Sequence, residues 1–108
     1  MNIGQIAKMA QQMQTQMAQA QEELKQTTLE ATAGGGAVRI VITGAQEVRS
    51  VEIDPSAVDP DEVEMLQDLV MTAINEAIGR SKEVERERMA SIAGGMGLPG
   101  MPGLPGFG

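Results

Sequence analysis

The strongest strand signal in the chain, residues 37–44, carries apolar side chains on both of its faces. Alternate residues of a strand point to opposite faces, so Val38, Ile40 and Ile42 share one face while Val41 lies on the other. Helices of the same chain can cover only one face of such a sheet. We therefore expect a second copy of the chain to cover the apolar remainder.

Two further segments have the composition of strands. Residues 28–33 precede the strong strand and are separated from it by Gly34-Gly35-Gly36, a turn that tolerates positive φ. Residues 47–54 follow after a short connection, with Val51 and Ile53 expected on one face and Val48 on the other. Together the three strands predict an antiparallel meander.

Helical periodicity brackets this meander on both sides. Residues 2–26 form a Met-rich apolar stripe in which apolar residues recur every three or four positions, and we favour core packing over a ligand groove for it. The stripe consists of Ile6, Met9, Ala10, Met13, Met17, Ala20 and Leu24.

A second helix is expected to open with Asp59 as its N-cap, Pro60 at N1 and Glu62 at N3. Its stripe should face the sheet up to Ile78, beyond which it loses most of its apolar face. At ~1.5 Å per residue, a helix over residues 60–90 overhangs strands of seven or eight residues.

Composition limits what chemistry the chain can perform. It has no Cys, His, Trp or Tyr, and its one aromatic residue is Phe107. Without His or Cys, the commonest general base and activated nucleophile are missing, and no motif surrounds the serines. We expect a protein that is not an enzyme and that has no cofactor, metal site or small-molecule substrate.

Length and charge narrow the class of protein further. A chain of 108 residues supports one domain with a thin core. Without Cys or His for disulfides or metal ligands, association with a second copy is the remaining way to stabilise such a core. No apolar run suits a bilayer or a secretory signal, so we expect a cytoplasmic protein. A net charge of -7 opposes broad attraction to nucleic acid.

Residues 94–108 are uncharged and rich in Gly and Pro. We expect a disordered tail after a domain over 1–93, with an apolar recognition segment as the alternative.

Five short motifs follow one another along the chain: Gly34-Gly35-Gly36, residues 38–44, Ile53-Asp54-Pro55, residues 66–69 and residues 73–77. Their order and spacing resemble those of the YbaB/EbfC family of bacterial nucleoid-associated proteins. One departure is Gln67, where the family commonly has Glu. The resemblance implies an α+β fold with a long N-terminal helix, a three-stranded antiparallel meander and a long C-terminal helix, dimerised through the sheet so that paired helices form tweezers around DNA. The expected dimer interface is Val38, Ile40, Val41, Ile42 and Val48.

The resemblance also decides between two interpretations of the charged helix end. On residues alone, pairs such as Glu76 with Arg80 and Glu85 with Arg88 favour a solvated, salt-bridged face. The resemblance instead favours DNA binding with low sequence specificity and a role in nucleoid organisation, with gene regulation as a further role. A protein-interaction scaffold that uses the Met-rich helix and the tail is the alternative. The candidate residues for double-stranded DNA are Lys8, Lys25, Arg80, Lys82, Arg86 and Arg88, with Lys82 and Arg86 as the best pair.

Overall fold

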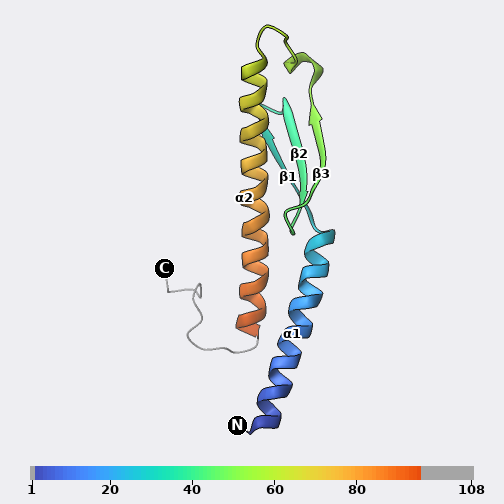
Figure 1. The fold of residues 1–108 in the computed structure, drawn as a ribbon, viewed down its shortest axis with the longest axis vertical. Coiled ribbons are helices and arrows are strands. Elements are labelled where there is room, and N and C mark those ends of the chain that lie inside the picture. The colour runs from blue at the N-terminus through green and yellow to red at the C-terminus, as the bar shows by residue number, and fades with distance from the viewer. Residues whose placement is uncertain (1, 96–108) are drawn as a thin grey trace, which may run out of the picture.

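The fold, seen in a computed structural model that describes residues 2–95, is a small sheet with one long helix along its face and a second long helix that extends from its end (Figure 1). The order is α1 (Ile3–Gln26), β1 (Thr28–Ala33), β2 (Val38–Thr43), β3 (Val48–Ile53), a short 3-10 turn η1 (Pro55–Ala57) and α2 (Val63–Gly95). This confirms the α+β architecture. Within the described residues, no helix is both long and apolar enough to cross a membrane.

The three strands form an antiparallel meander in the order β1-β2-β3. β1 and β2 pair in continuous register from Thr28↔Thr43 to Ala33↔Val38. The glycines of the connecting turn all have positive φ, at 64°, 68° and 99°, which explains why the turn consists of glycine alone. Each predicted strand agrees with the structure to within one residue at either end.

The core lies between α2 and the first two strands. Val38, Ile40 and Ile42 are completely buried on the face of β2 that α2 covers. Ala73 and Ala77 of α2 are buried opposite them, and these small side chains allow the helix to approach the sheet closely. The predicted stripe of α2 is therefore confirmed at its centre. Its margins differ, because Val63 remains 49% exposed and Ile74 37% exposed.

A β-bulge in β3 overturns the predicted placement of Val48. The register runs Ile40↔Val51 and Val41↔Ser50 but then Ile42↔Val48, so Arg49 is an extra residue without an opposite partner. The extra residue shifts the alternation of side chains by one position. Val48 therefore lies on the same face as Val51 and Ile53, the face on which α2 packs, and not on the opposite face.

The second helix begins later than its capping signals predict. Asp59 does not cap α2; its carboxylate accepts a hydrogen bond from the Asp61 amide at 2.9 Å, and its carbonyl accepts one from the Glu62 amide at 2.9 Å. These bonds close a turn over residues 59–62. The Asp-Pro pair suits a turn as well as a helix start, and here the helix starts after the turn, at Val63.

The first helix leaves the sheet rather than lying on it. Asn2 caps α1 through a capping box with Gln5, and at the other end the Gly44 amide donates to the Leu24 carbonyl at 2.9 Å. A Cβ at Gly44 would lie 2.8 Å from a methyl carbon of Leu24, so a larger residue would displace the helix. Only Ala20 and Leu24 of the apolar stripe are buried. The core-packing prediction is therefore wrong for the N-terminal half of α1 in the single chain.

Candidate nucleic-acid interface

Two helical segments extend beyond the sheet and form the arm of the molecule. The second half of α2 runs past the end of the strands, and α1 lies beside it in the opposite direction (Figure 1). This confirms the overhang expected from the lengths of helix and strand. We refer to residues 3–26 and 80–95 together as the arm.

A buried serine fixes the point where α2 leaves the sheet. Ser81 is fully buried, and its hydroxyl donates to the Thr43 carbonyl at 2.6 Å. The same oxygen accepts from the Gln46 amide at 3.0 Å and from the Gln46 side chain at 2.9 Å. Gln46 has φ of 60°, the left-handed region that a non-glycine residue adopts only at a cost. The β2–β3 turn is thus clamped to the base of the arm.

An ion pair ties the two helices of the arm together. The Arg88 guanidinium lies 2.9 Å from the Glu23 carboxylate of α1 and contacts it through two nitrogens. The predicted partner within the helix was Glu85, and that prediction is wrong because α1 brings Glu23 to the side of α2 on which Arg88 lies. A small groove lined by Leu24, Val84 and Ser91 among others adjoins this pair.

The six basic candidates differ in how far their charges are already engaged. Arg80 pairs with Glu76 at 2.9 Å, as predicted, and also donates to the Glu30 carbonyl of β1 at 3.0 Å. Lys25 pairs with Glu22 at 3.4 Å. Arg80 and Arg88 therefore have structural partners in other elements, which makes them poorer phosphate contacts than the sequence suggests.

Lys8, Lys82 and Arg86 are the basic residues best presented to solvent. All three are exposed, and among the described residues neither lysine takes part in an ion pair. Arg86 contacts Glu83, which raises the pKa of the arginine and lowers the pKa of the glutamate. Both side chains of that pair are largely exposed, so the pair is weak and a phosphate can compete for Arg86.

Two further arginines, which the sequence analysis did not select, organise the sheet surface. Arg39 lies 2.8 Å from Glu30 and 2.7 Å from Glu52, on the face opposite α2. Its hydrogen bond lowers the pKa of Glu30. Arg49, the bulge residue, donates to the Lys25 carbonyl at the end of α1 at 3.1 Å. Alignment of the strands by their turns would have found the Arg39 pairs, but the contact of Arg49 depends on the bulge.

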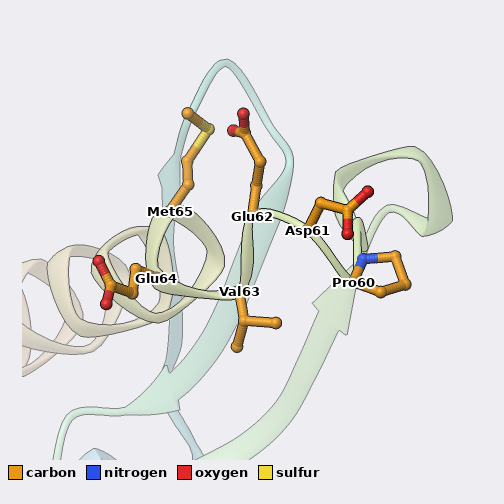
Figure 2. Close-up of a pocket in the computed structure, with 6 residues that line it drawn as sticks. All are labelled: Pro60, Asp61, Glu62, Val63, Glu64 and Met65. Carbon is orange, nitrogen blue, oxygen red and sulfur yellow. The ribbon is translucent and has the colours of Figure 1, made fainter.

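The negative charge of the chain is concentrated away from the arm. Residues 50–79 contain eight Asp and Glu and no Lys or Arg, whereas the rest of the chain has 8 basic and 7 acidic residues. Figure 2 shows Asp61, Glu62 and Glu64 at the start of α2, with carboxylates that point away from one another. The described residues contain no group of three or more His, Cys, Asp or Glu placed to hold a metal ion.

An open apolar flank lies between α2 and β3. Val48, Val51 and Ile53 are 45%, 50% and 39% exposed, although they lie on the face that α2 covers over β1 and β2. Met71 and Ile74 of α2 are also exposed, and together with Leu66 and Val70 they line a groove along that helix. We call these residues the β3 flank.

The β3 flank changes the expected dimer interface. Val38, Ile40 and Ile42 are fully buried beneath α2 of their own chain, so a second copy cannot contact them without displacing that helix. Val41 is half-buried on the opposite face, among the polar residues of the Arg39 cluster. Of the five predicted interface residues, Val48 alone belongs to the exposed apolar flank.

Comparison with known proteins identifies the family. A family model described as the YbaB/EbfC DNA-binding family matches residues 1–96. The chain belongs to this family. YbaB/EbfC proteins are a DNA-binding family and not a family of enzymes. The chain is 50% identical over 96 residues to a nucleoid-associated protein of Acetivibrio thermocellus, covering 89% of this chain and 85% of that protein. It is 51% identical to a nucleoid-associated protein of Chloroflexus aurantiacus, covering 89% and 96%.

A solved structure shares the fold of this YbaB/EbfC chain. An uncharacterized Helicobacter pylori protein, HP0035, superposes with a TM-score of 0.73 at 26% identity, covering 84% of this chain and 95% of that one. The family match ends at residue 96, so the predicted tail lies almost entirely outside it. Of that tail, Gly94 and Gly95 belong to α2, and residues 96–108 lie outside the described residues.

Proposed function

We propose that the chain is a nucleoid-associated protein of the cytoplasm that binds double-stranded DNA through its arm, as a homodimer and with low sequence specificity. Membership of a DNA-binding family supports DNA as the ligand. The concentration of negative charge outside the arm is the structural observation that supports the arm as the place where DNA binds. A role in organising the nucleoid, and through it in gene regulation, follows from many weak contacts spread over the chromosome.

Charge segregation removes the objection that a net charge of -7 raises against DNA binding. Electrostatic repulsion between exposed charges is screened beyond ~10 Å at moderate salt. Residues 50–79, with their eight acidic side chains, occupy the upper part of the molecule, whereas the arm, whose helices include Lys8, Lys82 and Arg86, extends below the sheet (Figure 1). A duplex at the arm therefore meets a nearly balanced surface with exposed cations.

Low specificity follows from the residues that the arm presents. The exposed basic side chains are spread along two helices, and the remaining polar surface of α1 is mostly glutamine. Lysine and arginine on phosphates position a protein on DNA without reading its sequence. We therefore assign Lys82 and Arg86 to the DNA backbone, with Lys8 as a third contact.

The β3 flank supports the homodimer. Three exposed β-branched side chains on a single edge strand are costly in water, and a two-fold interface places the same patch of two copies in contact. The opposite sheet face is polar, with Glu30, Arg39 and Glu52 joined by ion pairs. We accordingly place the dimer interface on Val48, Val51 and Ile53 together with Met71 and Ile74.

Fluorescence anisotropy of a labelled random-sequence duplex, titrated at several salt concentrations, tests the DNA assignment. Each phosphate contact contributes a slope of about 0.9 in log affinity against log salt. We expect Lys82→Gln/Arg86→Gln to weaken binding on every duplex alike and to reduce this slope by about 2. An unchanged slope contradicts the assignment of these two residues.

A variant with the same charge change elsewhere separates contact from net charge. Met65→Glu/Thr72→Glu lowers the net charge by the same two units, through two added carboxylates at exposed positions of α2 within the acidic region. It should leave the salt slope of DNA binding unchanged. An equal loss of DNA affinity in both variants would show that only total charge matters. Complete absence of DNA binding by the wild-type protein at low salt would favour the protein-interaction scaffold.

A further inference from the structure

The N-terminal half of α1 has an apolar stripe that the rest of the described chain leaves largely uncovered. Ile3 is 84% exposed and Ile6 is 53% exposed, while Met9 and Met13 are only half-buried. A helix in water gains most of its stability from packing an apolar face. The end of the arm therefore lacks the contacts that Ala20 and Leu24 provide nearer the sheet.

The last described residue of α2 lies beside the start of this uncovered stripe. Arg88 pairs with Glu23, and the two helices run in opposite directions (Figure 1). Since both rise ~1.5 Å per residue, Gly95 lies near the level of residue 16 of α1. The chain thus leaves α2 with about 20 Å of α1, from residue 16 to Ile3, still ahead of it.

The sequence that follows has a regular three-residue repeat. From Leu98 to Phe107 an apolar residue recurs at every third position, and Pro-Gly separates each from the next. A polyproline II helix has three residues per turn and rises ~3.1 Å per residue, which would place all these apolar side chains on one face about 9 Å apart. Residues seven apart on an α-helix, such as Ile6 and Met13, are about 10.5 Å apart on one face.

We propose that residues 96–102 dock on the N-terminal stripe of α1 as a polyproline II segment that continues the direction of α2. The distance of about 20 Å requires six or seven residues in this conformation, which the segment supplies. Leu98 then lies near Met9 and Met13, and Met101 lies near Ile3 and Ile6. The segment is uncharged, so it covers the stripe without adding repulsion toward phosphates near Lys8.

Amide hydrogen exchange of the full-length protein without DNA tests this docking. Leu98→Ser/Met101→Ser should speed exchange of residues 3–13 several-fold, because the end of α1 loses its cover and frays. The matched control is Leu104→Ser/Phe107→Ser, which removes the same kind of side chain beyond the reach of the stripe and should leave the exchange rates unchanged. Equal exchange of residues 3–13 in all three proteins overturns the proposal.

Methyl NMR of the full-length protein locates the segment directly. Docking predicts nuclear Overhauser contacts between the Met101 methyl group and the methyl groups of Ile3 or Ile6. Contacts from Met101 to Val48 or Val51 instead would place the segment on the β3 flank and overturn the proposal. Contacts to α1 that disappear on dilution would assign the cover to a second copy, which also contradicts docking within one chain.

Discussion

Strands β2 and β3 are neighbours with similar sequences of alternating apolar residues, yet their environments are opposite. Ile40 and Val51 are direct cross-strand partners, but Ile40 is completely buried and Val51 is 50% exposed. The difference arises from α2, which packs over β1 and β2 and leaves β3 at the margin. Alternation in a strand therefore predicts which side chains share a face, and not whether anything covers that face.

This contrast separates two kinds of apolar residue in one small sheet. Those on β2 hold the single chain together, whereas those on β3 are left exposed by the described residues, and we propose that they serve association. A truncation to alanine on β2 should therefore lower the free energy of unfolding, whereas one on β3 should raise the dimer dissociation constant. Four substitutions, taken from the largest expected effect to the smallest, test these two strands and the contacts around them.

Ile40→Ala should destabilise the fold by about 2–5 kcal/mol, because it leaves a cavity between α2 and the sheet. Chemical denaturation followed by circular dichroism measures the free energy of unfolding. A cost below about 1 kcal/mol would show that α2 is not packed tightly on β2.

Ser81→Ala should cost about 1–3 kcal/mol in the free energy of unfolding, because it removes three hydrogen bonds at the base of the arm, one to the Thr43 carbonyl and two from Gln46. The same denaturation experiment measures it. Ser91→Ala, at an exposed position on the same helix, is the control and should be nearly neutral. Equal effects would mean that the clamp does not hold α2.

Val51→Ala should act mainly on association. The substitution removes two methyl groups from each copy, and because Val51 is already half-buried in the single chain, it should raise the dimer dissociation constant about tenfold, or about 1.4 kcal/mol. Analytical ultracentrifugation over a range of concentrations measures this constant, and Ser50→Ala, on the opposite face of β3, is the control. A dimer that is unaffected by Val51→Ala would place the interface elsewhere.

Glu30→Gln should have the smallest effect, confined to the polar face of the sheet. Arg39 lowers the pKa of Glu30, so the carboxylate stabilises the fold above its ordinary pKa, and this contribution is lost as the pH falls through the lowered value. The variant should melt slightly below the wild type at pH 7, and the difference should shrink as the pH falls below the ordinary range of a glutamate. A difference that stays constant as the carboxylate becomes protonated would require another cause.

The sequence predicted the elements well because their signals are local. Alternation located all three strands, and the three glycines located their first turn. The local pattern could not show the bulge at Arg49, since both registers of β3 place apolar residues on some face. Asp59 and Pro60 suit a turn and a helix start equally well, and only the whole chain chooses between them.

The candidate site was less accessible to prediction than the fold. Its basic residues are visible in the sequence, but their availability depends on partners in distant elements. Glu23 is 65 positions away from Arg88, and the carbonyl of Glu30 is 50 positions away from Arg80. Intrahelical spacing identified the Glu76–Arg80 pair and missed the Arg88–Glu23 pair because α1 packs beside α2.

The contact of Arg80 with the Glu30 carbonyl bears on how many copies can join. It occupies a backbone acceptor on the outer edge of β1, whereas β3 presents the other edge of the sheet beside its exposed apolar side chains. Open-ended polymers require two adhesive sites per subunit, and a chain with a single one can only form a closed pair. One arginine on the first strand thereby leaves that edge of the sheet less open to a strand of another copy than the edge formed by β3.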